Sequence, residues 1–299
     1  MKDLIIAGSG PAGLSAAVYA ANAMLDFAVI EKFPMSGGQM LNTYDINNYL
    51  GFEAVDGFTL GQAFRKHAEN KGSEFINDEI ISIDKIDGGY SIKCNKGEYE
   101  AKTVIFATGA NPKKLGVKGE LELAGRGVSY CATCDGNFFR GKKTAVIGGG
   151  DVALEDALYL ANICEEVYLI HRRDELRGAK YLQDKVMSND KIKILYSNEA
   201  EEIIGENKVE KLKLKNGKEL DVDGVFIAVG LEPNSKLLEG IADMENGFIK
   251  ADESGTTSAE GIFAAGDVRT KRLRQISTAV SDGANCVHSV EEFINKNNS

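Results

Sequence analysis

The chain carries one short pattern twice: an apolar strand, a glycine-rich turn and a helical stretch that leads to a second strand. In the first copy, the strand Asp3–Ala7 runs into Gly8-Ser9-Gly10-Pro11-Ala12-Gly13, and a helical stretch follows to about Met24. The next strand, Phe27–Ile30, ends at Glu31. This order is typical of a βαβ unit in which glycines let the backbone approach a pyrophosphate at the helix N-terminus. A carboxylate at the position of Glu31 can accept hydrogen bonds from both hydroxyls of an adenosine ribose.

The second copy lies in the middle of the chain. A strand over Thr144–Ile147 leads into Gly148-Gly149-Gly150-Asp151-Val152-Ala153, and another helical stretch follows. The next strand is Val167–Ile170, and His171 stands at the position that Glu31 has in the first copy. The repetition predicts an α/β protein with two dinucleotide-binding domains.

The two copies differ in charge after their second strand. His171 is followed by Arg172 and Arg173, with Arg177 further on, where the first copy has the acid Glu31. Guanidinium groups in place of a carboxylate are what recognition of a ribose 2′-phosphate requires. A solvated basic turn is the alternative, because two acidic residues stand alongside. The positional match favours NADPH over NADH as the ligand of this copy.

Both copies continue to an apolar strand that ends in glycine, at residues 104–109 and 225–230, with proline three positions later. The first copy is 19 residues longer between its motif glycine and this strand end (101 residues against 82), and the excess follows Glu31. It forms an extended loop that contains Gly38-Gln39 and Asn48. A bulkier cofactor beside the first motif explains such an insertion, and flavin adenine dinucleotide (FAD) meets that need.

The last stretch, from about Asn246, is too short to bury a core of its own and must return to one of the two domains. It contains a strand over Ile262–Ala265 that ends in Gly266-Asp267, then a basic turn and a helix that starts near Gln275. A carboxylate at a strand end suits the ribityl chain of a flavin. A helix N-terminus suits negative charge on the flavin ring.

We therefore expect two Rossmann-like domains of three-layer ββα type, with the second inserted in the first. The expected FAD domain is discontinuous and comprises residues 1–113 and 246–299. The expected NADPH domain comprises residues 114–245.

Cys131 and Cys134 stand three residues apart, and Asp135 follows directly. Such a pair can cycle between dithiol and disulfide. A CxxC pair is also half of a zinc site, but no further ligands stand at matching spacing, so no metal is expected. The other cysteines have no partner at motif spacing and are predicted to be structural thiols: Cys94, Cys164 and Cys286.

Composition narrows the classes of partner. With a net charge of −10 over 299 residues, the chain is not expected to bind nucleic acid or an anionic membrane. The first apolar run ends at Gly8, too early for a secretion signal or a membrane span. A cytoplasmic protein is expected, in which cysteines are normally reduced.

Taken together, these motifs resemble those of the low-molecular-weight thioredoxin reductases over essentially the whole chain. The match consists of GSGPAG with Glu31, GGQ at 37–39, CATCDG at 131–136, GGGDVALEDA at 148–157, HRRDELR at 171–177 and GDV at 266–268. Two departures are mild. Leu50 precedes Gly51 where relatives often have proline, and Asp151 stands where many have asparagine. The extra carboxylate of Asp151 is expected to weaken pyrophosphate binding slightly.

The resemblance implies non-covalent, tightly bound FAD in the first domain, NADPH in the second, and a homodimer. Electrons would pass from NADPH through the flavin to the Cys131–Cys134 disulfide and then to thioredoxin. Cys134 would meet the flavin, Cys131 would attack thioredoxin, and Asp135 would donate or accept the proton. Because Cys134 lies only 14 residues before Gly148, disulfide and NADPH would share one domain, which would have to rotate between the two half-reactions.

The candidate ligand residues follow from the motifs. The residues expected to contact FAD are Gly8, Gly10, Pro11, Ala12, Gly13, Glu31, Lys32, Gly38, Gln39, Asn48, Thr108, Gly109, Gly266, Asp267, Arg274, Gln275 and Ile276. Those expected to contact NADPH are Gly148, Gly150, Asp151, Val152, Ala153, His171, Arg172, Arg173 and Arg177.

Two other interpretations remain open at this point. A related flavoprotein could reduce another redoxin or a small disulfide, or could draw its electrons from ferredoxin; the three arginines argue against ferredoxin. A redox sensor without catalysis is the alternative from a different class. It predicts bound FAD without steady-state reduction of a disulfide.

Overall fold

The chain divides into two compact units in the computed structural model, which describes residues 1–43, 46 and 48–297. Unit 1 combines residues 1–111 with 232–299, and unit 2 comprises residues 112–231. The second unit is thus inserted in the first, and both are α/β folds with parallel sheets, which confirms the predicted fold class.

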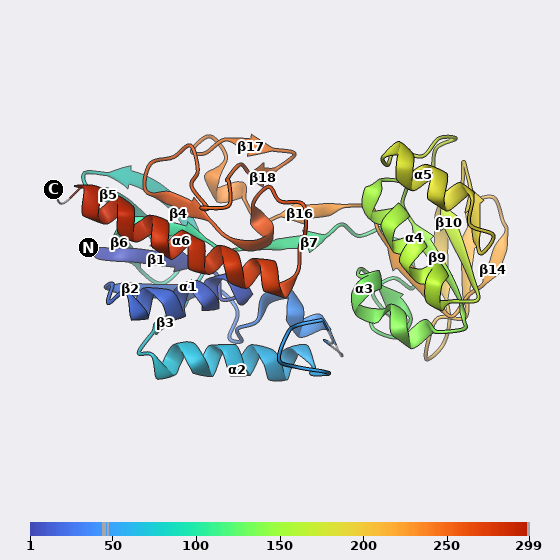
Figure 1. The fold of residues 1–299 in the computed structure, drawn as a ribbon, viewed down its shortest axis with the longest axis horizontal. Coiled ribbons are helices and arrows are strands. Elements are labelled where there is room, and N and C mark those ends of the chain that lie inside the picture. The colour runs from blue at the N-terminus through green and yellow to red at the C-terminus, as the bar shows by residue number, and fades with distance from the viewer. Residues whose placement is uncertain (44–45, 47, 298–299) are drawn as a thin grey trace. The chain divides into compact units, whose positions relative to one another are not determined.

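Unit 1 is built on a sheet in the order β3-β2-β1-β6-β5-β4 (Figure 1). The first half of β6 pairs antiparallel with β5, and its last residues pair parallel with β19. The strands of unit 1 are β1 (Lys2–Ala7), β2 (Phe27–Glu31), β3 (Glu74–Asn77), β4 (Ile80–Ile86), β5 (Gly89–Cys94), β6 (Glu98–Phe106), β17 (Met244–Glu245), β18 (Phe248–Ile249) and β19 (Ile262–Ala264). Its helices are α1 (Pro11–Asn22), α2 (Gly57–Asn70) and α6 (Ile276–Asn297), with the 3-10 turns η1 (Gly38–Asn42), η3 (Lys236–Leu238) and η4 (Gly266–Val268).

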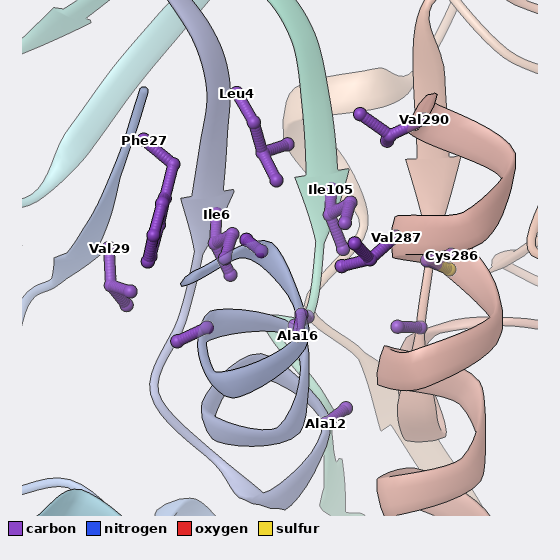
Figure 2. Packing of buried hydrophobic residues seen from close by; sticks show 14 of the residues in the cluster. Leu4, Ile6, Ala12, Ala16, Phe27, Val29, Ile105, Cys286, Val287 and Val290 are labelled. Atoms are coloured by element: carbon purple, nitrogen blue, oxygen red, sulfur yellow. The ribbon is translucent and has the colours of Figure 1, made fainter. Parts of the chain in front are cut away.

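Successive residues of the parallel strands in unit 1 pack into opposite layers. Leu4 and Ile6 of β1 belong to the core beneath α1 and α6, whereas Ile5 belongs to the core on the other face, with Ile92 of β5. Figure 2 shows Leu4 and Ile6 on the side of the sheet where α1 and α6 lie. Because both faces are covered, these strands are continuously apolar, as is typical of parallel sheets.

The return crossing to unit 1 differs from the predicted position. It lies between Leu231 and Glu232, and not between residues 245 and 246. The physical reason is burial: Leu238 and Ala242 pack in the same core cluster as Ile5 of unit 1. The first crossing, after residue 111, is two residues from the predicted one.

Unit 2 repeats the plan with a parallel sheet in the order β11-β10-β9-β15-β8 and an antiparallel sheet β12-β13-β14. Its strands are β8 (Val128–Ser129), β9 (Lys143–Ile147), β10 (Glu166–Ile170), β11 (Ile192–Leu195), β12 (Ala200–Ile204), β13 (Lys211–Leu214), β14 (Glu219–Asp221) and β15 (Gly224–Ile227). Its helices are α3 (Ala132–Asp135), α4 (Asp151–Ile163) and α5 (Lys180–Met187), with the 3-10 turn η2 (Gly136–Phe139).

The parallel sheet of unit 2 also lies between two layers. Val146 and Phe226 pack with the helices, whereas Ala145 and Val225 pack with Leu212 of the antiparallel sheet. This is the three-layer ββα arrangement that the repeat predicts.

The chain passes between the units at β7 (Ala110–Pro112) and β16 (Leu231–Pro233), and these two strands pair with each other. Asn234 fastens the unit 1 end of the pair: its amide donates to the Thr108 carbonyl oxygen at 2.9 Å and accepts from Asn111 at 3.0 Å. Within the part of the chain that is described, no helix has the length and apolar character needed to cross a membrane.

Candidate active site

The first glycine turn joins β1 to α1, and its glycines serve different purposes. Gly8 has φ of +103°, and a Cβ there would lie 2.6 Å from the Ala107 carbonyl oxygen. A Cβ on Gly13 would collide with the Gly8 carbonyl oxygen, so this glycine lets the helix pack closely on the turn. Gly10 is different: the nearest atom to its Cβ would be the Gly38 Cα, 4.0 Å away. Packing within the protein therefore does not explain Gly10, whereas close approach of a ligand does.

Gly10 is also the N-cap of α1, and no side chain caps this helix. Pro11 follows at the first helical position, where a missing N–H has no consequence. The free N–H groups of this first turn and the positive end of the helix dipole are suited to a pyrophosphate. This geometry fits the sequence prediction for the first motif.

Glu31, at the end of β2, is held against the glycine turn. Its Oε2 accepts hydrogen bonds from the Ser9 backbone N–H and hydroxyl, both at 2.8 Å, and its Oε1 accepts from the Phe33 N–H at 3.0 Å. The carboxylate is thus oriented at the edge of the motif. Lys32, which was also predicted to contact FAD, is exposed and lies 4.0 Å from Glu79.

The loop after β2 brings other predicted residues to the same place. The Gly37 N–H donates to the Ser9 carbonyl oxygen at 2.9 Å, and Gly38 lies against Gly10. Gln39 follows in η1 and is exposed. Asn48 donates from its amide to Gln275 Oε1 at 3.0 Å, which joins this loop to the segment that opens α6.

Thr108 and Gly109, at the end of β6, face the return crossing. The Thr108 hydroxyl donates to the Asn234 carbonyl oxygen at 2.8 Å, and the Asn234 N–H donates to the Gly109 carbonyl oxygen at 2.9 Å. Both predicted residues are therefore engaged by the neighbouring chain segment.

The C-terminal turn η4 lies beside the first glycine turn, since a Cβ on Gly266 would be 3.0 Å from the Ala12 Cβ. Asp267 Oδ1 is buried and has no hydrogen-bond partner among the described residues. Burial raises the pKa of Asp267, and the nearby cations Lys271 and Arg274 partly offset this rise. A buried acceptor without a partner beside a dinucleotide motif fits a ligand hydroxyl, such as one of a ribityl chain.

Arg274 and Ile276 frame the start of α6. The Arg274 guanidinium lies 4.2 Å from the centre of the Phe248 ring and donates to the carbonyl oxygens of Lys271 and Arg269. Its Nε is buried without a partner in the described chain. Ile276 is the first residue of α6, as the sequence predicts for a helix near Gln275.

The second glycine turn, between β9 and α4, has the same construction. A Cβ on Gly148 would lie 2.7 Å from the Ala153 Cβ, whereas no heavy atom lies within 4 Å of the Cβ position of Gly150. Gly150 is the N-cap of α4, again without a side-chain cap. Ala153 is fully buried, and Val152 is exposed at the first turn of the helix.

His171, at the end of β10, differs from Glu31 in its surroundings. It is 6% exposed, and a Cβ on Gly149 would collide with its imidazole. Burial lowers the pKa of His171, a hydrogen bond with the backbone of Glu175 partly offsets this, and the charges of the neighbouring arginines lower the pKa further, so the ring is neutral near pH 7. Its Nε2 has no partner among the described residues.

The disulfide lies in unit 2. Cys131 and Cys134 are bonded, with Cα atoms 5.3 Å apart, and Cys131 is the N-cap of α3. Gly136 holds α3 against α4, because a Cβ there would lie 2.8 Å from the Tyr159 ring and 3.1 Å from Leu160. The redox pair is therefore built onto the helix of the second glycine motif.

Asp135 is tied to the strand before the disulfide. The Ser129 hydroxyl donates to Asp135 Oδ2 at 2.6 Å and accepts from the Cys131 N–H at 3.1 Å. Burial raises the pKa of the Asp135 carboxyl above its ordinary value, and the hydrogen bond from Ser129 lowers it in part. Ser129 thus links the Asp135 carboxyl to the backbone of Cys131.

Comparison with known proteins agrees with this geometry. The profile of the Pyridine nucleotide-disulphide oxidoreductase family matches residues 2–283. The chain belongs to this family. A curated relative from Bacillus subtilis (strain 168), named thioredoxin reductase, is 44% identical over 98% of this chain and 94% of its own length.

Solved structures named thioredoxin reductase are similar to this chain in fold. Thioredoxin reductase from Streptococcus pyogenes MGAS5005 is 43% identical, with a TM-score of 0.89 over 99% of both chains. The Lactococcus lactis thioredoxin reductase, described as the FR conformation, is 39% identical, with a TM-score of 0.70 over 99% of this chain and 100% of its own.

The other cysteines of this family member are unpaired and poorly reactive. Cys164 and Cys286 are buried, and Cys94 is half-buried. Burial raises the pKa of the Cys94 thiol to about 11 and that of Cys286 to about 12, so neither forms the reactive thiolate near neutral pH. Their structural role in the prediction agrees with these surroundings.

Sequence reasoning missed a buried ionic network beneath η4. Asp282 of α6 accepts hydrogen bonds from Arg269 Nη2 at 2.7 Å, from Lys271 Nζ at 2.7 Å and from the Gly266 N–H at 2.8 Å. The side chains of all three charged residues are at most 4% exposed. In the sequence, the segment 269–274 is typical of a surface turn. The sign that its cations are buried is Asp282, an aspartate among small residues in α6.

Proposed function

We propose that the chain is an NADPH-dependent thioredoxin reductase that uses FAD and the Cys131–Cys134 disulfide. One observation carries the proposal: a disulfide is mounted on the helix of one dinucleotide motif, in a chain that has a second such motif. The names of the curated relative and of both solved structures support the same activity.

The cysteines carry the exchange with the protein substrate. In the reduced state, the Cys131 thiolate attacks the disulfide of thioredoxin, and a mixed disulfide forms as a thioredoxin thiolate leaves. Cys134 then attacks the Cys131 sulfur, which releases dithiol thioredoxin and restores the Cys131–Cys134 bond. Asp135 accepts the proton of the attacking thiol and returns it to the leaving thiolate. These roles rest on the motif resemblance and on the Ser129–Asp135 contact.

The first glycine turn is proposed to hold FAD and the second NADPH. Gly10 and Gly150 leave room for a pyrophosphate, Glu31 faces the first turn, and the unpartnered Asp267 Oδ1 suits a ribityl hydroxyl. Bound FAD would accept two electrons from NADPH and deliver them to the disulfide. The protein's own contribution is to bind, orient and shield these groups.

Rotation of unit 2 between the half-reactions is part of the proposal. The disulfide and the second glycine turn belong to the same unit, and each has to reach one flavin in turn. The paired strands β7 and β16 are the two segments about which unit 2 would turn. A crosslink that joins the units should block turnover while FAD stays bound. Full activity of the crosslinked protein would refute the rotation.

The decisive experiment is a flavin absorbance titration. NADPH should bleach the flavin at low stoichiometric ratios, NADH should require a large excess, and oxidised thioredoxin should restore the oxidised spectrum. Failure to reduce any thioredoxin in a panel would exclude the proposed acceptor. Bleaching by reduced ferredoxin in place of NADPH would transfer the proposal to a ferredoxin-dependent enzyme. Bound FAD without steady-state disulfide reduction would indicate a redox sensor.

A homodimer is proposed with the activity, on the motif resemblance alone. Sedimentation equilibrium of the FAD-loaded protein measures the mass directly. A monomer mass that persists at micromolar concentration would contradict it.

A further inference from the structure

The basic loop after β10 combines free side chains with a fixed backbone. Arg172, Arg173 and Arg177 are exposed, and none of their guanidinium groups forms a hydrogen bond or an ion pair within the described residues. The neighbouring acids Asp174 and Glu175 form no ion pair with them in that same part of the chain. The three guanidinium groups are therefore not tied into hydrogen-bonded ion pairs within the described residues, although the charge of Arg172 contributes to lowering the pKa of Glu199.

Three successive N–H groups fasten this loop to the second glycine turn. The N–H groups of Arg177 and Gly178 donate to the Gly149 carbonyl oxygen at 2.7 and 3.2 Å. The Ala179 N–H donates to the carboxylate of Asp151 at 2.6 Å. The first two contacts join backbone to backbone, so the contact of Asp151 is the one that a side chain supplies.

The far side of the loop is held as well. Gln183 of α5 donates from its amide to the Gly178 carbonyl oxygen at 2.7 Å. A Cβ on Gly178 would lie 2.5 Å from Leu154 Cδ1 and 3.1 Å from Asp151 Oδ1, so this glycine fits closely against α4. Unpaired guanidinium groups on a backbone held from both sides form a pre-organised site for an anion.

We propose that Asp151 is a positioning residue for cofactor specificity: its carboxylate holds Ala179 and, together with the backbone hydrogen bonds of Arg177 and Gly178, keeps the arginine loop against the pyrophosphate turn, which favours the fit of a ribose 2′-phosphate. This inference rests on the proposed use of NADPH and deepens it. It also revises the sequence expectation for Asp151. A carboxylate at the first residue of α4 repels a pyrophosphate if it is free, but one lone pair of this carboxylate is engaged by the Ala179 N–H. The carboxylate is therefore expected to lower the affinity for the pyrophosphate slightly and to fix the arginine loop.

The expected result is a change in selectivity rather than a general loss of binding. Without the carboxylate, the loop keeps its two backbone hydrogen bonds to Gly149 but loses the one at Ala179, so the position of Arg177 is less firmly fixed. Only a cofactor with a 2′-phosphate uses Arg177. Asp151→Ala should therefore raise the Kd of NADPH about tenfold, the equivalent of one charge-assisted hydrogen bond, and leave the Kd of NADH within about twofold. Asp151→Asn keeps an oxygen acceptor in the same place and should restore most of the selectivity.

The test measures equilibrium binding of NADPH and of NADH to the FAD-loaded full chain, for the wild type and for both variants. Glu165→Ala, which removes an exposed carboxylate just beyond the other end of α4, is the matched control and should leave both Kd values unchanged. Amide hydrogen exchange at Ala179 gives a second reading, because its protection should fall in Asp151→Ala and return in Asp151→Asn.

The outcomes separate the inference from the function it rests on. A wild-type preference for NADPH that shrinks in Asp151→Ala supports the positioning role. An unchanged preference, or an equal weakening of NADPH and NADH, overturns it while the proposed function stands. A wild type that does not prefer NADPH removes the proposed donor, and the positioning role falls with it.

Discussion

The two glycine turns have the same backbone geometry, but the side chains that follow the second strand of each copy differ in charge. Each is capped by a glycine with room for a ligand, Gly10 in the first turn and Gly150 in the second. The strand after the first helix ends in a carboxylate that Ser9 orients. The strand after the second ends in a buried neutral imidazole, followed by exposed guanidinium groups.

This difference teaches where specificity resides in a repeated fold. Glycine is required at these positions by backbone sterics and by the close approach of a pyrophosphate, which is common to dinucleotides. Both copies therefore have the glycines. In the proposed function, the side chains that follow the second strand contact the part of the dinucleotide that differs between the two sites. In the proposed function, the choice of dinucleotide therefore depends on the side chains at this position, a carboxylate in the first copy and arginines in the second.

The largest expected effect on activity comes from a change to the redox pair of unit 2. Cys134→Ser removes one sulfur of the disulfide, so reduction of thioredoxin and of the reagent DTNB should fall by about a thousandfold or more. Bleaching of the flavin by NADPH should persist, because neither glycine turn is altered. Cys286→Ser, a change of a buried unpaired thiol, is the control and should keep disulfide reduction. Turnover that survives in Cys134→Ser would show that the role assignment is wrong.

The side chains that follow the second strand can be tested by one substitution in each copy. Arg173→Ala removes a guanidinium from the second turn and should raise the Kd of NADPH about 10- to 100-fold, without effect on retained FAD. Glu31→Ala should weaken FAD by a similar factor and leave NADPH unaffected. Isothermal titration of each cofactor gives all four values. Lys208→Ala, an exposed cation elsewhere in unit 2, is the control.

Substitutions of the turn glycines are expected to have smaller effects on cofactor affinity. Gly10→Ala and Gly150→Ala place a methyl group where the protein leaves space, so the apo protein should unfold within about 0.5 kcal/mol of the wild type. Each should weaken only the cofactor of its own turn, by about tenfold. Gly8→Ala is the contrast, because its positive φ and the nearby Ala107 carbonyl oxygen should reduce stability by about 1 to 3 kcal/mol. Equal losses of stability in all three would mean that Gly10 and Gly150 also serve packing.

The smallest effect concerns pH. The Ser129 hydroxyl stabilises ionised Asp135, so Ser129→Ala should raise the pKa of this carboxyl. If the carboxylate is the base for Cys131, the acid limb of the pH–rate profile for thioredoxin reduction moves to higher pH, by less than about one unit. Ser129→Thr keeps a hydroxyl and should return the limb to its original position. An acid limb that does not move would remove Asp135 from proton transfer.

Much of this architecture is predictable because it rests on local rules. Short stretches such as Asp3–Gly13 are enough to predict the order of strand, turn and helix. They also predict the glycines at positive φ and the alternation of residues between the two core faces. The disulfide follows from two cysteines that stand three residues apart. Asn48 and Gln275 were predicted to contact one cofactor and do meet each other through a hydrogen bond.

The remainder depends on contacts between distant segments. The return crossing lies earlier in the chain than the sequence predicts, because no local pattern marks Leu238 and Ala242 as part of the core of unit 1. Pro233 was the available signal, since it occupies the position that Pro112 has at the first crossing. The burial of Arg269 and Lys271 depends on Asp282, which comes from a different element. Sequence spacing does not reveal such a partner.

The pairing of β7 with β16 has a consequence for how this chain could arise and be rebuilt. Where the inserted unit begins and ends, the Lys113 N–H donates to the Gly230 carbonyl oxygen at 3.0 Å, so its two ends are neighbours. For the host, an insertion with adjacent ends is equivalent to lengthening one hairpin loop, which a fold tolerates well. The adjacent ends predict that a short turn can replace unit 2 in the host, and that the ends of the excised unit are close enough to be joined.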